Sequence, residues 1–185
     1  MSSSLLLWTT LALLLFWGVG LYNRLMRMRA RGLSAFGSVE KHLREYAELT
    51  RDQTHRVHRG LTDEPLLRSS ESMADWSLVL SSLQKLDHAL KDARTTPFGS
   101  DQLVVLAHAM ASVREAWDAL RAVPADLAGP VVPDDVQVQW DAIARRVETS
   151  RNGYNQILLK YNEALEQFPA RLITGLMGFK AGGTL

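Results

Sequence analysis

The order of apolar and polar positions divides the chain into one uncharged apolar run and a series of amphipathic segments. The run covers residues 5–22, LLLWTTLALLLFWGVGLY. As a helix it would be about 27 Å long, close to the ~30 Å hydrocarbon core of a bilayer. We therefore predict a transmembrane helix over 5–22, within an N-terminal unit of residues 1–22. A cleaved signal peptide is the alternative, but the leading MSSS has no basic residue and no A-x-A cleavage site follows.

After the anchor, apolar residues recur at steps of three and four, which is typical of helices that bury one face. Glycine and proline interrupt this pattern around residues 59–72, 95–101 and 123–135. We predict helices over about 23–58, 73–94, 101–122 and 135–168, forming a bundle unit of residues 23–169. A short tail, residues 170–185, is predicted to pack on or near the bundle as a helical turn. The fold class is therefore all-α, an N-terminal transmembrane helix followed by an elongated antiparallel four-helix bundle.

The last predicted helix has an apolar residue at every seventh position. These residues are Trp140, Val147, Tyr154, Tyr161 and Phe168. Seven residues make two helical turns, so the five side chains share one stripe, as in a coiled coil. We expect the other helices to pack against this stripe, and the helix that leaves the membrane to be its main neighbour.

Asn155 and Asn162 each follow a tyrosine of the stripe and therefore line one of its edges. One interpretation is structural: the two amides bind neighbouring helices or loop backbone and fix the register of the bundle. The other interpretation is a ligand or partner groove made by the tyrosines and the asparagines. Aromatic stripes at helical spacing are more often core than binding surface, which favours the structural interpretation.

Charge is nearly balanced over the whole chain, with a formal net charge of +1, so no nucleic-acid partner is predicted. Basic residues concentrate directly after the anchor, at Arg24, Arg27, Arg29 and Arg31. No basic residue precedes the anchor, so the positive-inside rule places the N-terminus outside and the bundle in the cytoplasm. The same arginines are predicted to contact anionic lipid headgroups.

Candidate chemistry is sparse. The chain has no cysteine, which excludes disulfides, thiol nucleophiles and cysteine-based metal sites. It has no Glu-x-x-His pair, no phosphate-binding glycine loop and no nucleophile-elbow motif. We predict no catalytic residue, no cofactor and no metal.

Two stretches are similar to the LemA family. The C-terminal one carries a repeated Tyr-Asn, a Phe-Pro and a Gly-Phe, and the other is a Tyr-Asn (22–23) directly after the anchor. The C-terminal motif residues are Tyr154, Asn155, Tyr161, Asn162, Phe168, Pro169, Gly178 and Phe179. One stretch departs from the family: residues 42–53 lack the proline that the family's first helix usually carries. The resemblance implies a bacterial single-pass membrane protein with a helical soluble domain, and it implies no particular activity.

Two functions remain open at this point. The first is a non-enzymatic scaffold or protein-interaction module at the cytoplasmic face of the bacterial inner membrane, with the lipid bilayer and other proteins or a second copy as partners. The second is a small-ligand binder or an enzyme that uses a cleft near Asn155 and Asn162.

Overall fold

The computed structural model contains four long helices and describes residues 2–63, 70–124, 130–167, 171, 174–175 and 178–185. The helices are α1 (Ser2–Asp63), α2 (Ser70–Thr95), α3 (Ser100–Ala122) and α4 (Asp134–Glu166). The described part of the chain contains no strand. The predicted fold class, all-α with a long N-terminal apolar helix ahead of a bundle, is confirmed.

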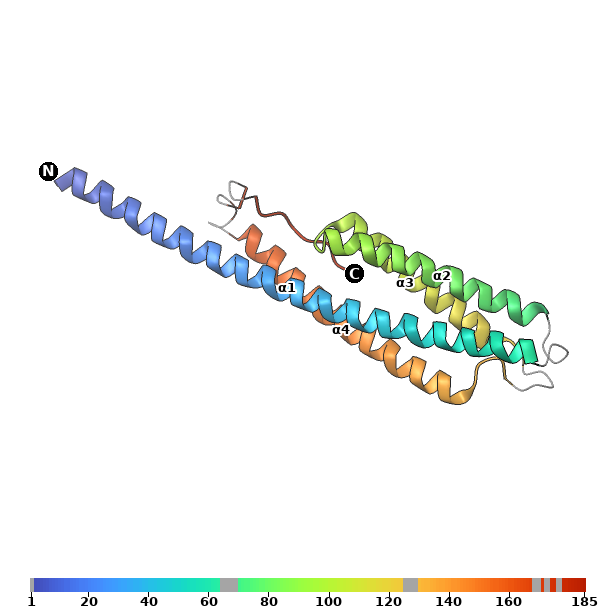
Figure 1. Ribbon diagram of the computed structural model, residues 1–185. Coiled ribbons are helices and arrows are strands. Elements are labelled where there is room, and N and C mark those ends of the chain that lie inside the picture. The colour runs from blue at the N-terminus through green and yellow to red at the C-terminus, as the bar shows by residue number, and fades with distance from the viewer. Residues whose placement is uncertain (1, 64–69, 125–129, 168–170, 172–173, 176–177) are drawn as a thin grey trace.

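The bundle is built from two closely packed antiparallel pairs, α1 with α4 and α2 with α3. Figure 1 shows the two pairs lying side by side, with α1 projecting beyond the other helices at its N-terminal end. The predicted pairing of the last helix with the helix that follows the anchor is therefore confirmed. Ion pairs join one helix pair to the other along the surface, among them Arg121 to Asp141 at 3.4 Å. Exposed pairs of this kind contribute at most about 1 kcal/mol each, so they do not hold the bundle together.

Helix α1 is one continuous element that includes both the apolar run and the first helix of the bundle. Its 62 residues correspond to about 93 Å of helix. Its N-terminal part is long and apolar enough to cross a membrane, and none of that window is buried within the protein. Leu25 is fully buried only three residues beyond Tyr22. The bundle therefore begins directly at the end of the apolar run, with no spacer between them.

Both ends of the loop predicted over 59–72 are helical instead, because α1 continues to Asp63 and α2 already begins at Ser70. Gly60 does not end the helix, since a glycine inside a helix costs only about 1 kcal/mol. Pro65 is the stronger breaker because it disfavours helix at the residue before it. Pro65 itself lies outside the described residues, as do Phe168 and Pro169 at the other predicted helix end.

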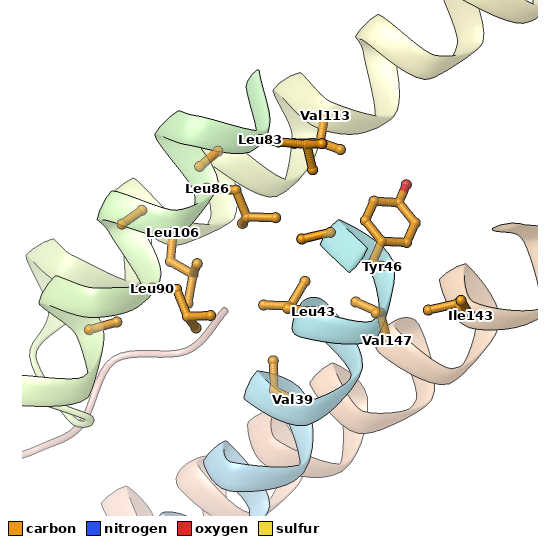
Figure 2. Close-up of a cluster of buried hydrophobic side chains, with 14 of the residues drawn as sticks. Val39, Leu43, Tyr46, Leu83, Leu86, Leu90, Leu106, Val113, Ile143 and Val147 are labelled. Carbon is orange, nitrogen blue, oxygen red and sulfur yellow. The ribbon is translucent and has the colours of Figure 1, made fainter. Parts of the chain in front are cut away.

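All four helices contribute to one apolar core (Figure 2). Val39, Leu43 and Tyr46 of α1 face leucines of α2 and the residues Ile143 and Val147 of α4 in that view. The predicted stripe on α4 is confirmed where it is described, because Trp140, Val147, Tyr154 and Tyr161 are all at most 5% exposed.

One aromatic residue from each helix joins a continuous contact chain inside this core. The Tyr46 and Trp140 ring centroids are 3.7 Å apart, and Trp140 stacks on Trp117 at 3.8 Å with nearly parallel rings. Trp117 in turn meets the edge of Trp76 at 6.4 Å. Because the chain runs through α1, α4, α3 and α2 in that order, it links the two helix pairs. The indole N–H groups of Trp76 and Trp117 are buried without a hydrogen-bond partner, so this contact is one of packing alone.

Candidate functional site: the asparagine ladder

Asn155 and Asn162 bind the backbone of the chain's own C-terminal tail, residues 178–185. The Asn162 amide donates from Nδ2 to the Gly182 carbonyl at 2.8 Å and accepts at Oδ1 from the Gly182 N–H at 2.9 Å. Asn155 makes the same two-point contact with Leu185, at 2.6 Å to its backbone oxygen and 2.7 Å from its N–H. We call this pair of contacts the asparagine ladder. In the structure the two amides thus bind backbone of the chain itself, as the structural interpretation of the asparagines predicted.

The seven-residue spacing of the asparagines follows from the geometry of the two elements that they join. Seven residues of helix rise about 10.5 Å. Three residues of extended chain cover about 10 Å. Gly182 and Leu185 are three residues apart, so both can meet an asparagine on one face of α4 without strain. The tail must be extended for this match, which explains why residues 179–185 are not helical.

The tail was predicted to form a helical turn, and this is correct only for its first residues. Arg171 and Thr174 are helical, whereas the tail after Gly178 has no helix. Glycines at 182 and 183 disfavour helix by up to about 1 kcal/mol each. The four ladder hydrogen bonds then favour the extended form, because an asparagine amide pairs with the N–H and C=O of one extended residue as a neighbouring strand would.

The tail lies between α4 and the turn that joins α2 to α3. Tyr154 donates from its hydroxyl to the Pro97 carbonyl in that turn at 2.7 Å, and the Gly183 N–H binds the Phe98 carbonyl at 3.1 Å. A Cβ on Gly182 would lie 2.5 Å from Leu158 Cδ1, and one on Gly183 would lie 2.7 Å from Ser100 Cα. The two glycines are therefore needed because the tail passes closely between the two helix pairs.

This fit predicts opposite effects for two glycine-to-alanine changes. Gly183→Ala would push a methyl group against backbone and should destabilise the bundle by about 1–3 kcal/mol, as overpacking does. Gly153→Ala is the matched control, since it lies in α4 with nothing within 4 Å of the added Cβ. Gly153→Ala should stabilise by about 0.5–1 kcal/mol through helix propensity. Urea unfolding of the full chain in detergent micelles, followed by circular dichroism, measures both. Equal effects of the two changes would contradict the close fit of the tail.

Phe98, in the turn between α2 and α3, contacts several of the elements that meet at this end of the bundle. Its ring lies 3.0 Å from the position that a Cβ on Gly32 of α1 would take, and its centroid is 5.8 Å from that of Tyr161 on α4. The Arg29 guanidinium lies over the same ring at 5.8 Å from the centroid. Phe98 therefore joins the α2–α3 pair to the α1–α4 pair beside the tail.

The Gly-Phe of the motif places the start of the tail against α1. Gly178 has a φ of +70°, a left-handed conformation that favours glycine. The turn brings the Phe179 ring edge-on to Tyr22, with centroids 5.8 Å apart, and the Phe179 N–H binds the Thr174 carbonyl at 3.1 Å. Tyr22 is the last residue of the apolar run, so the tail begins at the level where the run ends.

Three tyrosines have a raised pKa, and in each of them burial is the main cause. Burial of Tyr46 and of Tyr154 raises the pKa of each hydroxyl well above its ordinary value. Burial also raises the pKa of Tyr161, while the Arg29 charge acts against this rise. All three are therefore uncharged under ordinary conditions, as their packing in the core requires.

These raised pKa values predict a loss of stability in alkali. An unfolded tyrosine ionises near pH 10, whereas the buried ones hold their protons more tightly. Their contribution is therefore fully present below about pH 10 and is lost as the pH rises above it. The urea midpoint of the full chain should begin to fall near about pH 10 and should continue to fall as the pH rises further. Tyr154→Phe should show a shallower fall, and an unchanged slope in that variant would contradict the assignment.

The four arginines predicted to contact headgroups do not share one face of α1. Arg24, Arg27 and Arg31 are exposed, and their spacing of three and four places them on the side of the helix away from Leu25 and Gly32. Arg29 points toward the α2–α3 turn, where it contacts Phe98. Three of the arginines, at the start of the bundle, are therefore directed away from it, and the fourth contacts the α2–α3 turn.

Other features of chemical interest are limited in the described residues. That part of the chain contains no group of three or more His, Asp or Glu side chains close enough to hold a metal ion. A cavity of about 640 Å³ opens beside the tail, lined by Arg29, Phe98, Tyr161, Phe179 and Lys180 among others. A second one, of about 210 Å³, lies between α3 and the α1–α4 pair near Tyr46, Arg114 and Arg151.

Several residues of this site were not identified from the sequence. The pattern singled out Tyr154, Asn155, Tyr161 and Asn162, but not their partners Pro97, Phe98, Gly182, Gly183 and Leu185. One signal for the partners was available in the sequence. The tail has glycines at 182 and 183, and the distance from Gly182 to Leu185 in an extended chain equals the rise of two helical turns, which is the spacing of the two asparagines. Nothing local marks Phe98, since a phenylalanine beside Pro97 and Gly99 is compatible with an ordinary exposed turn.

These features define a class of protein: an all-helical bundle that continues an N-terminal apolar helix, with an extended tail held by asparagines on its longest soluble helix. Comparison adds a family resemblance, because residues 105–184 match the model of the LemA family. That match covers most of α3, all of α4 and nearly the whole tail, and so confirms the predicted resemblance where the ladder is formed. Comparison with curated proteins and with solved structures returned no match.

Proposed function

We propose that this protein is a non-enzymatic, membrane-anchored scaffold or protein-interaction module. The observation that carries the proposal is the continuity of α1, in which a buried bundle residue, Leu25, follows the apolar run by three positions. A bundle attached in this way is held at a fixed distance and angle from the bilayer, which a flexible linker would not achieve. A rigid platform near the surface suits the binding of other proteins better than it suits the capture of a soluble substrate.

The ionisable side chains support the same proposal. Ion pairs among the described residues, such as Arg146 with Glu45 at 3.5 Å, lie at the surface of the bundle. The strongly raised pKa values belong to tyrosines that pack in the core. A catalytic site would bring an activated base or nucleophile into a cleft, whereas burial raises the pKa of Tyr46 and of Tyr161, which line the two cavities, and so makes them harder to ionise.

Affinity purification tests the interaction role. The full chain, tagged and extracted from its membrane in mild detergent, should retain a protein partner or a second copy of itself at stoichiometric levels. A chain cut after the anchor is not an adequate substitute, because α1 is shared by the anchor and the bundle. Recovery of the chain alone, as a monomer, under several mild conditions would overturn the proposal.

We further propose the inner membrane of a bacterium as the location, with the N-terminus outside and the bundle in the cytoplasm. Arg24, Arg27 and Arg31 support this orientation because they are exposed directly after the apolar run, where the positive-inside rule applies. The same three side chains could bind anionic headgroups at about 1 kcal/mol each.

The orientation predicts the behaviour of a reporter. A phosphatase that is active only outside the cytoplasm, fused after Leu185, should remain inactive. Replacing Arg24, Arg27 and Arg31 by alanine and placing three lysines at positions 2–4 should invert the anchor and activate the reporter. Activity in the unaltered fusion would contradict the proposed orientation.

A small-ligand site is the second candidate, favoured by one observation. The cavity of about 640 Å³ beside the tail combines two cations, Arg29 and Lys180, with the aromatic rings of Phe98 and Tyr161. This is not the cleft along Asn155 and Asn162 that the sequence suggested, because the tail occupies that edge. Paired Arg29→Ala and Lys180→Ala changes should abolish any ligand that copurifies with the chain, and a ligand retained by that variant would exclude this cavity.

A further inference from the structure

The asparagine ladder binds main chain and not side chains. All four ladder hydrogen bonds go to backbone N–H and C=O groups, two at Gly182 and two at Leu185. Two tail positions must be small, since Leu158, Phe98 and Ser100 lie within 3 Å of a Cβ on Gly182 or Gly183. The Leu185 side chain in addition packs against the apolar core. Any extended segment with two small residues at these positions would therefore satisfy the ladder. In chemical terms this is a binding groove for an extended peptide, and the chain's own tail is its occupant.

The groove is formed by elements that pack independently of the tail. One wall is α4, which pairs with α1, and the other is the α2–α3 turn, whose helices pair with each other. The aromatic contact chain of Tyr46, Trp140, Trp117 and Trp76 already joins the two pairs. An equivalent peptide can therefore replace the tail without a change in how the four helices are arranged.

A second copy of this chain is the occupant that the geometry favours. Its tail has the same Gly-Gly pair and the same three-residue spacing, so it fits without alteration. Chains anchored by the same apolar run lie parallel in one membrane, and Tyr22 meets Phe179 at the start of the tail. Grooves of neighbouring chains are therefore at equal height above the bilayer. Residues 168–177 join α4 to the tail, and ten residues span at most about 35 Å when extended. Exchange therefore requires the helical residues Arg171 and Thr174 to become extended.

We propose that the groove along Asn155 and Asn162 takes the tail of a second copy, so that two anchored chains are joined by exchange of their tails. The exchanged contacts are the same as those made within one chain, so exchange costs no ladder hydrogen bond. Confinement to one membrane raises the effective concentration of the second tail above its value in solution, so exchange should increase with the density of anchored chains. This inference rests on the proposed interaction role and names its partner.

Crosslinking between two differently tagged copies tests the exchange. Because the chain has no cysteine of its own, only the introduced cysteines can react in it. One copy carries Leu159→Cys, on α4 between the two asparagines, and the other carries Thr184→Cys, between the two bound tail residues. Both positions are exposed, so both variants should fold. The copies are coexpressed, and their membranes are treated with a short bis-maleimide. A chain that carries both cysteines shows that the two positions are within reach of the reagent.

A matched control measures random collision. Val138 lies on α4, is 69% exposed and is about 31 Å along the helix from Leu159. We expect the heterodimer from Leu159→Cys with Thr184→Cys to exceed that from Val138→Cys with Thr184→Cys several-fold. Asn155→Ala with Asn162→Ala in the Leu159→Cys copy should reduce it to the control level. Excess synthetic peptide of residues 178–185 should do the same.

Three results would overturn the exchange. The first is crosslinking within the doubly substituted chain but no heterodimer, and the second is no crosslink in either form. The third is a heterodimer that equals the Val138 control or resists the peptide, since it would report proximity and not occupancy of the groove. The scaffold proposal would survive each of them, because recovery of another protein with the full chain does not depend on tail exchange.

Discussion

Replacing Trp117 by alanine should lower the free energy of unfolding of the bundle by about 3–5 kcal/mol. Trp117 is fully buried and stands in the middle of the aromatic contact chain, stacked on Trp140 and meeting the edge of Trp76. Its removal would leave a large cavity where α3 meets α4, and the two helix pairs would lose their central contact. Urea unfolding of the full chain in micelles, followed by circular dichroism at 222 nm, measures the change without relying on tryptophan fluorescence.

Two controls separate packing from other effects of the change. Trp117→Phe retains an aromatic ring and should cost clearly less, and no hydrogen bond is lost, because the Trp117 indole N–H has no partner. Trp8→Ala removes a tryptophan that is 65% exposed in the apolar run and should leave bundle stability unchanged. If Trp117→Ala cost no more than Trp8→Ala, the aromatic chain would not be what joins the helix pairs.

The second large effect is expected from Asn155→Ala combined with Asn162→Ala. The double change removes four hydrogen bonds, each of which contributes about 0.5–1.5 kcal/mol, so we expect a loss of about 2–6 kcal/mol. The tail should also detach, since its backbone is held to α4 through these two amides. Hydrogen exchange reports detachment directly, because the Gly182 and Leu185 N–H groups are bound by Asn162 and Asn155. Both amides should exchange much faster in the variant.

Two further variants make this prediction specific. Asn152→Ala changes an exposed asparagine on the same helix and should affect neither stability nor exchange. Asn162→Asp keeps the acceptor for the Gly182 N–H but loses the donor to its carbonyl, so a weaker effect than full truncation would show that both halves of the contact contribute. Unchanged exchange at Gly182 and Leu185 in the alanine double variant would contradict the ladder.

The tail has a structural consequence beyond its own attachment. It is held by α4 through the asparagines, by the α2–α3 turn through the Phe98 carbonyl, and by α1 through Tyr22. It therefore closes the bundle at the end where the apolar run joins it, while the aromatic contact chain closes the bundle farther from that end. Loss of the tail should loosen one end of the bundle and leave the other packed.

The sequence by itself determined the helices and their buried faces. Periods of three and four depend on helical geometry alone, so the stripes of α1 and α4 could be read residue by residue and are buried as expected. The apolar run, the all-α class and the resemblance to the LemA family could also be predicted from the sequence, because each depends on local composition or on a local motif. The spacing of Tyr154, Asn155, Tyr161 and Asn162 identified the edge of α4 that is used.

Only the tertiary structure decided what that edge binds. The partners of Asn155 and Asn162 lie 30 and 20 residues away, respectively, in an extended segment whose own sequence does not demand that form. The same holds for Phe98, whose place beneath Arg29 and against Gly32 depends on how the α2–α3 pair meets α1. A helix can be predicted from its period because its hydrogen bonds are local. The ladder could not, because its hydrogen bonds join two elements whose relative position is set by packing of the whole bundle.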